Sequence, residues 1–128
     1  MKLRLRGNTL RLRLSRSEVR LLGDGKSVSE GTQFPGGSEL VYSLNVTDSI
    51  AHLDQFNEGT VFRIDMYVPA EITKQWACSS AVSLFGDKPL RLSPLEVLIE
   101  KDFACLNLEG AAAGDQDSFP NPNSSPSI

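Results

Sequence analysis

The first fourteen residues, MKLRLRGNTLRLRL, alternate leucine with basic residues on either side of a short polar break. Alternation of apolar and polar residues with period two is typical of a strand with one buried face. The leucines occupy odd positions before the break and even positions after it, so a shared apolar face requires paired residue numbers with an odd sum. A two-residue loop at Asn8-Thr9 meets this requirement. The pairs predicted across it are Arg6 with Arg11 and Arg4 with Arg13.

Two further segments carry helix signals. Ser15 and Glu18 have the spacing of a capping box, which predicts a short helix through residue 22 with Val19 and Leu22 facing the core. Pro69 suits the first position of a second helix over residues 69–77, because its fixed φ is compatible with a helix start. Ile72 and Trp76 lie four residues apart on one face of that helix, so we expect Trp76 to be anchored in the core.

The other predicted elements are strands, separated by turn residues. Segments 26–34 and 39–46 flank Pro35-Gly36-Gly37 and predict a hairpin. Residues 49–56 fit either a short helix or a strand, and the Gly59 turn before a strand over 60–68 favours a second hairpin. Residues 80–85 and 90–100 predict a last pair of strands, the second kinked at Pro94, where the apolar parity switches.

These elements predict an α+β fold with a mainly antiparallel sheet, or a partly closed barrel, of seven to eight strands with two short helices. We expect residues 1–108 to form a single globular β-rich domain, which is long enough to bury a core. Residues 109–128 contain no basic residue, three prolines and four serines. This composition is typical of a low-complexity tail.

The formal net charge of −3 conceals an uneven distribution. Residues 1–26 hold eight of the 13 Lys and Arg residues, whereas residues 27–128 hold fourteen of the 16 acidic ones. This split favours neutralisation within the chain and does not support nucleic-acid binding. Because no apolar segment has the length of a membrane span or the pattern of a signal peptide, we expect a cytoplasmic protein without a membrane partner. Cys78 and Cys105 are then expected to be reduced.

Arginine directly opposite arginine on a sheet face is unfavourable by roughly a few tenths of a kcal/mol for each pair. The predicted hairpin therefore requires negative charge near four residues: Arg4, Arg6, Arg11 and Arg13. Three sources are open. The first is a set of carboxylates on neighbouring strands, such as Asp65, Glu96 and Glu100. The second is a bound phosphate or other small anion, which suits the two-pronged guanidinium group. The third is the tail folding back, with Asp115 and Asp117 as the anions and Phe119-Pro120 as an apolar anchor.

The sequence carries no catalytic, metal or cofactor motif. Asp115-Gln116-Asp117 lacks the turn glycine and the closing glutamate of a calcium loop, and His52 and the two cysteines lack the spacing of a zinc site. The glycine-rich turns precede no Lys-Ser or Lys-Thr pair. We therefore assign no catalytic residue, metal or cofactor, and predict a non-catalytic binding or accessory module for a small anion or a protein partner.

The two ends of the chain resemble a known pattern. It begins with Met1–Leu14 followed by Ser17-Glu18-Val19, and it ends with Glu100-Lys101-Asp102-Phe103-Ala104-Cys105-Leu106 and Phe119-Pro120-Asn121-Pro122. These stretches are similar to a family of small, uncharacterised bacterial proteins known only as a domain of unknown function. The resemblance implies a bacterial, cytoplasmic protein and assigns no activity. Because the Phe-Pro-Asn-Pro segment belongs to the pattern, the resemblance also favours partial docking of the tail on the body through this segment.

An enzyme alternative comes from the triphosphate-tunnel class, whose antiparallel barrels carry inward basic residues and hydrolyse phosphoanhydrides with a divalent metal. The protein would then be a phosphate- or polyphosphate-processing enzyme. The first strand of those enzymes alternates acidic residues before a lysine. Here the corresponding stretch, Lys2-Leu3-Arg4-Leu5-Arg6, has no carboxylate to hold a metal, which argues against hydrolysis.

Overall fold

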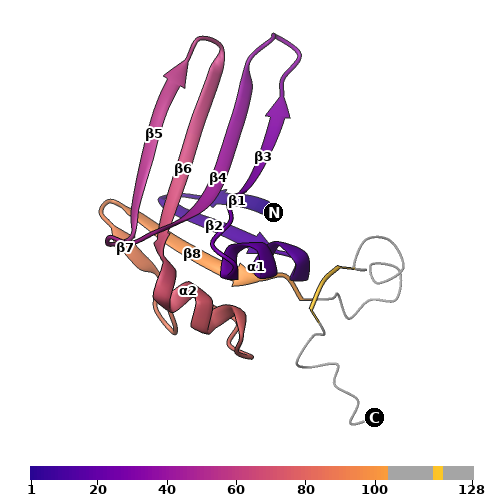
Figure 1. Cartoon of the computed structure of the whole chain (residues 1–128). Helices are drawn as coiled ribbons and strands as arrows, with labels where there is room; N and C mark the ends of the chain where they lie inside the picture. The colour runs from indigo at the N-terminus through magenta and orange to yellow at the C-terminus, as the bar shows by residue number, and fades with distance from the viewer. Residues whose placement is uncertain (104–116, 120–128) are drawn as a thin grey trace. The chain divides into compact units, whose positions relative to one another are not determined.

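The computed structural model describes residues 1–103 and 117–119, which contain eight strands and two helices (Figure 1). The predicted α+β class with two short helices is confirmed. The eight strands form two four-stranded sheets. The chain divides into two compact units. One unit comprises residues 20–81 with Met1, and the other comprises residues 2–19 with the chain from 82 onward. The prediction of one domain over residues 1–108 stays a prediction.

The first sheet, which we call the arginine sheet, has the strand order β1-β2-β8-β7. Strands β1 (Lys2–Arg6) and β2 (Thr9–Leu14) form an antiparallel hairpin, as do β7 (Leu90–Leu92) and β8 (Leu95–Lys101). The two hairpins join through parallel pairing of β2 with β8. One face of the two central strands is buried, and its apolar residues are Leu10, Leu12, Leu14, Val97 and Ile99.

The β1–β2 hairpin differs from the prediction by two residues in register. The loop is Gly7-Asn8, and the pairs across it are Arg4 with Arg11 and Lys2 with Arg13. Arg6 therefore lies opposite Thr9, not opposite Arg11. Leucine still faces leucine, because a shift of two residues preserves the face of every side chain. Gly7 decides the register, since its φ of 56° gives the positive φ that a type II′ hairpin loop needs at its first central residue.

The variant Gly7→Ala is expected to lower the free energy of unfolding by about 1–2 kcal/mol, because a Cβ is strained at this positive φ. The surrounding space is open, so no steric clash adds to the effect. Denaturant unfolding of the variant measures the loss. Gly36→Ala is the matched control, because Gly36 also lies in an open turn but does not adopt a positive φ. An equal loss in both variants would contradict this explanation.

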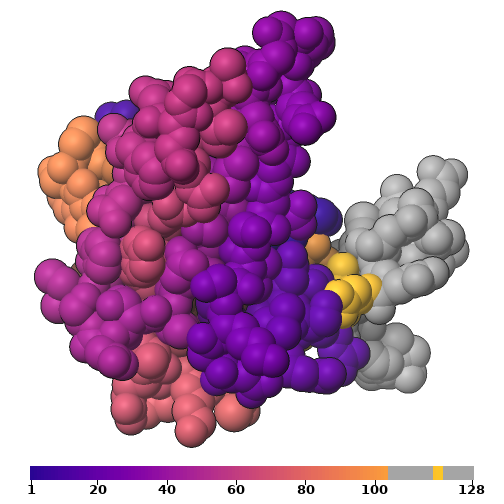
Figure 2. Space-filling model, turned by 45° about the horizontal axis from the view of Figure 1, so that its top comes forward, coloured from indigo at the N-terminus to yellow at the C-terminus, as the bar shows by residue number. Residues whose placement is uncertain are grey.

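The second sheet has the order β3-β4-β6-β5 and lies entirely within the other unit. Strands β3 (Val28–Gln33) and β4 (Glu39–Thr47) form the first predicted hairpin. Strands β5 (His52–Glu58) and β6 (Val61–Pro69) form the second, so the ambiguous segment 49–56 is resolved in favour of a strand. The buried residues of this sheet include Val28, Leu44, Met66 and Val68. The exposed turn between β3 and β4 projects at the top of the space-filling view (Figure 2).

The prediction of a mainly antiparallel sheet or a partly closed barrel is wrong in its finer part, because both sheets are open and mixed. In each of them two hairpins join through parallel pairing of their second strands, β2 with β8 and β4 with β6. Each hairpin is specified by its own short turn. A parallel pair is closed by a long connection, so nothing local in the sequence marks it.

Helix α1 (Arg16–Gly23) begins with the predicted capping box. The Ser15 amide donates to Glu18 Oε1 at 2.9 Å, and the Glu18 amide donates to Ser15 Oγ at 3.4 Å. Both residues predicted to face the core, Val19 and Leu22, are buried. This helix therefore forms where the sequence places it.

Helix α2 (Ala70–Ala77) follows directly on β6. Pro69 is its N-cap with an extended ψ of 132°, one residue before the predicted position, because Pro69 also ends the strand. Trp76 is buried as predicted, but Thr73 shares the buried side and Ile72 is 38% exposed. Among the described residues, neither helix has the length or apolar content to cross a bilayer.

The segment before the C-terminal strand also departs from prediction. Residues 80–85 form no named strand and contribute only an isolated bridge between Ser83 and Glu100. The predicted strand over 90–100 is instead the β7–β8 hairpin, with Leu92 paired to Leu95 around Ser93-Pro94. The apolar positions change from even numbers in β7 to odd numbers in β8 because a two-residue loop joins the two strands. The loop Gly7-Asn8 produces the corresponding change, from odd to even numbers, between β1 and β2. Pro94 fits there because a loop residue needs no ladder donor.

Candidate functional site: an arginine-rich sheet face

Strand register determines which side chains share the polar face of the arginine sheet. Residues paired directly across strands point to the same side of a sheet. Three rows of residues therefore cross β1, β2 and β8 on this face. They are Lys2–Arg13–Glu100, Arg4–Arg11–Leu98 and Arg6–Thr9–Glu96.

The first row is neutralised within the sheet. Lys2 Nζ lies 2.8 Å from Asp102 Oδ2, just beyond the end of β8. Glu100 Oε1 lies 3.7 Å from Arg13 Nε and 3.5 Å from Arg11 Nε. Glu100 is thus close enough to form ion pairs with both arginines. It is one of the neighbouring-strand carboxylates that the sequence offered as partners of the arginines.

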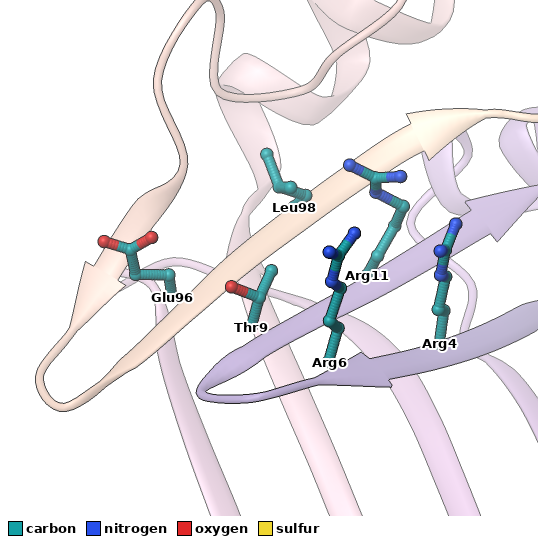
Figure 3. A pocket seen from close by; sticks show the side chains of 6 residues that line it. All are labelled: Arg4, Arg6, Thr9, Arg11, Glu96 and Leu98. Carbon is teal, nitrogen blue, oxygen red and sulfur yellow. The ribbon is translucent and has the colours of Figure 1, made fainter.

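The third row contains a carboxylate that is already engaged elsewhere. Glu96 Oε2 accepts a hydrogen bond of 3.1 Å from Arg91 Nη2 on the neighbouring strand β7. Figure 3 shows the Glu96 side chain turned away from the guanidinium groups of Arg4, Arg6 and Arg11. Glu96 therefore does not neutralise the arginines of β1.

The middle row has no carboxylate, because β8 presents Leu98 opposite Arg11. Arg4 and Arg6 form no ion pair with any carboxylate in the described parts of the chain. The Nε of Arg11 is buried without a hydrogen bond, although it lies near Glu100. Arg11 therefore shares the charge of Glu100 with Arg13, and the positive charge of Arg4 and Arg6 is left uncompensated by the carboxylates of the described residues.

A pocket of about 280 Å³ lies over this uncompensated charge. We call it the arginine pocket, and Figure 3 shows that the side chains of Arg4, Arg6 and Arg11 rise from the same side of the sheet into it. It is lined by Arg4, Arg6, Thr9, Arg11, Glu96 and Leu98. Because Arg13 is not among them, the structure gathers three of the four predicted arginines and leaves the fourth beside Glu100.

The C-terminal segment contacts the beginning of α1, and its described contacts are not with the arginine pocket. The Ser17 amide donates to Asp117 Oδ1 at 3.2 Å, and the Ser17 hydroxyl donates to Asp117 Oδ2. The Arg16 amide donates to the Asp117 carbonyl at 2.8 Å. In Figure 2 residues 117–119, in yellow, lie against the indigo surface that includes the start of α1. Asp117 thus accepts amide protons that the first turn of α1 cannot satisfy itself.

Phe119 provides the apolar part of the same contact. Its amide donates to the Asp102 carbonyl at 2.8 Å, and its ring lies 5.8 Å from that of Phe103 between centroids. Lys101 Nζ lies 5.4 Å from the centroid of the Phe119 ring. Asp115 and Pro120, the other two residues of the predicted docking segment, lie outside the described residues. Tail docking in solution stays a prediction.

The Asp117 contact predicts a measurable pH dependence. Hydrogen bonds from Ser17 and then from Ser15, together with the charge of Arg16, hold the pKa of Asp117 below its ordinary value. A carboxyl with a lowered folded pKa stabilises the fold above its unfolded pKa, and that stabilisation is lost as pH falls through the lowered value. We expect the Ser17 amide resonance to titrate at this low pH, as followed by NMR. In Asp117→Asn the titration should disappear, and its persistence would contradict the contact.

Comparison with protein-family models decides the affiliation of the chain. Residues 1–123 match the model of a family of unknown function, DUF7009. The chain belongs to this family. The sequence resemblance to an uncharacterised domain family is thereby confirmed. No curated protein and no solved structure matches this DUF7009 chain significantly.

The DUF7009 chain has a second polar cluster, on β4 and β6 of the second sheet. Asp65, which we proposed as a partner of the N-terminal arginines, instead accepts hydrogen bonds from Ser43 Oγ at 2.6 Å and from Arg63 Nη2 at 3.1 Å. Asp65 holds the pKa of Arg63 above its ordinary value. Asp65 is thus bound within its own sheet by a serine hydroxyl and an arginine. Within residues 1–103 and 117–119, no three His, Cys, Asp or Glu side chains are placed to hold a metal ion.

Sequence reasoning missed two of the residues that line the arginine pocket of this DUF7009 chain, Leu98 and Thr9. Both enter the arginine pocket through pairing, because Leu98 lies opposite Arg11 and Thr9 lies opposite Arg6. One signal was available for Leu98. In the stretch Glu96-Val97-Leu98-Ile99-Glu100, leucine stands at the position where strict alternation expects a polar residue.

Proposed function

We propose that the protein is a non-catalytic binding module that holds a small anion in the arginine pocket, with Arg4, Arg6 and Arg11 as its ligands. The observation that supports this most directly is the middle row of the sheet, where Arg4 faces Arg11 and the paired residue of β8 is Leu98. Arg11 shares Glu100 with Arg13, and Arg4 has no ion pair with a carboxylate in the described residues. Like charges opposed on a sheet are unfavourable, so an anion between them removes a repulsion and also gains charge-assisted hydrogen bonds.

The pocket suits a compact anion better than an extended one. Its volume of about 280 Å³ lies at the lower end of the range of small-molecule sites. The neighbouring row is closed to further anions, because Glu100 and Asp102 already pair with its basic residues. The Thr9 hydroxyl lines the same pocket and can donate one more hydrogen bond.

The alternative of a triphosphate-tunnel enzyme has no observation in its favour here. Such an enzyme encloses its basic residues inside a barrel, whereas the arginine sheet is open. The carboxylates nearest the arginines are bound to basic side chains, Glu100 to Arg11 and Arg13 and Glu96 to Arg91. A protein partner and a cytoplasmic location stay predictions.

A thermal-unfolding screen of the wild-type protein tests the proposal. Inorganic phosphate, sulfate and pyrophosphate are added separately, with potassium chloride adjusted to equal ionic strength. Binding to the native state raises stability by RT ln(1 + [L]/Kd), which is about 2.7 kcal/mol at a ligand concentration of 100 Kd. We expect at least one of these anions to raise Tm in a saturable way. No rise with any of them beyond that of the matched chloride would overturn the proposal.

A further inference from the structure

Among the described residues that line the arginine pocket, Leu98 is the one with an apolar side chain, and its position is unusual. On the polar face of β8 it stands between two carboxylates, Glu96 and Glu100, and directly opposite Arg11. It is partly exposed, whereas its neighbours Val97 and Ile99 on the other face are fully buried. The core of the sheet therefore lies on the side away from Leu98.

The side chains around Leu98 are arranged as two adjoining surfaces. Arg4, Arg6 and Arg11 present guanidinium groups from β1 and β2, and Leu98 presents a branched apolar group from β8 (Figure 3). Adjacent strands lie about 4.8 Å apart, so the Leu98 backbone is one strand from Arg11 and two from Arg4. An anion held between Arg4 and Arg11 therefore shares the pocket with the Leu98 side chain on the neighbouring strand.

Resting on the proposed function, we infer that the ligand is a free phosphomonoester whose phosphate carries an apolar organic group next to the ester oxygen. The phosphate dianion pairs with the guanidinium groups, which present donors that match its oxygens. The organic group covers Leu98, and removal of apolar surface from water contributes about 25 cal/mol per Å². The small pocket selects a small molecule and not a polymer.

Comparison of two ligands with the same charge tests this inference. Methyl phosphate and phenyl phosphate are titrated separately into the wild-type protein, and each Kd is measured by NMR chemical-shift changes or by calorimetry. Burial of several tens of Å² of the phenyl ring predicts that phenyl phosphate binds about tenfold more tightly than methyl phosphate. Equal affinity for the two esters would overturn the inference.

Two variants establish that Leu98 is the source of the preference. Leu98→Thr removes most of the apolar surface while keeping a residue that favours strands, so the preference for phenyl phosphate should fall to about twofold or less. Leu5→Thr is the matched control, because Leu5 is a 60% exposed leucine on the opposite face of the same sheet. Its preference should stay at about tenfold. Far-UV circular dichroism and a cooperative thermal transition like those of the wild type show that each variant is folded, and an unchanged preference in Leu98→Thr would overturn the assignment.

Failure of the inference is distinguishable from failure of the proposed function. If neither ester and no inorganic anion binds, the anion-binding function is wrong. If methyl phosphate and phenyl phosphate bind equally, the anion site stands and the apolar subsite is wrong. A capped phosphotyrosine tripeptide that binds tenfold more tightly than phenyl phosphate would overturn the assignment to a free small molecule.

Discussion

Truncation of Ile99 to alanine is expected to lower the free energy of unfolding by about 2–5 kcal/mol. Ile99 is fully buried on β8, and it lies between Val97 and Lys101 on the buried face of the arginine sheet. The loss combines the transfer free energy of the deleted methyl and methylene groups with the cavity that they leave. Denaturant unfolding measures it, and an unchanged m-value would show that the variant still unfolds as the wild type does.

Leu98→Ala is the matched control for this prediction, because it shortens the neighbouring side chain on the other face of the same strand. Leu98 is partly exposed, so its truncation should cost clearly less than that of Ile99. Binding of phenyl phosphate should respond in the opposite order: it should weaken in Leu98→Ala and stay like that of the wild type in Ile99→Ala wherever that variant is folded. Equal losses of stability in the two variants would contradict the assignment of a core face and a ligand face to β8.

The elements with local signals were predictable from the sequence. The capping box of Ser15 and Glu18 places α1, and short turns place the β1–β2, β3–β4 and β5–β6 hairpins. Each signal spans only a few residues, within which local propensity and turn chemistry act. What the sequence left open is how these hairpins combine, since the parallel pairing of β2 with β8 links residues more than eighty positions apart.

The same limit applies to the site. The alternation of leucine with arginine in the first fourteen residues predicts that the arginines share one face. The side chains beside them depend on the pairing with β8. Parallel pairing places Glu100 opposite Arg13 and Leu98 opposite Arg11, so Arg11 and Arg13 share one carboxylate, and Arg4 has no ion pair with a carboxylate in the described parts of the chain. The hairpin register also mattered, because Gly7 moves Arg4 opposite Arg11. An alternation of period two fixes the face of a side chain but not its cross-strand neighbour.

The variant Arg4→Gln is expected to weaken binding of the best inorganic anion by about 10–100-fold. A hydrogen bond to a charged group contributes about 1.5–3 kcal/mol, and each 1.4 kcal/mol corresponds to a tenfold change in Kd. Glutamine keeps the length and polarity of the side chain but removes its charge. Arg4 suits this test because it lines the pocket, is exposed, and has no ion pair with any carboxylate in residues 1–103 or 117–119.

The stability of Arg4→Gln separates a binding role from a structural one. Without ligand, Arg4 and Arg11 repel each other, so the variant should be as stable as the wild type or more stable by a few tenths of a kcal/mol. Arg91→Gln is the matched control on the same face, because Arg91 pairs with Glu96 and does not line the pocket.

We expect Arg91→Gln to change anion affinity by less than about twofold, since exposed ion pairs contribute little. A loss of stability in Arg4→Gln with unchanged anion affinity would show that the arginine row serves the fold. Weaker binding together with undiminished stability is the result that a ligand site requires. If Arg4 served only the fold, its replacement would relieve the repulsion with Arg11 and leave anion affinity unchanged.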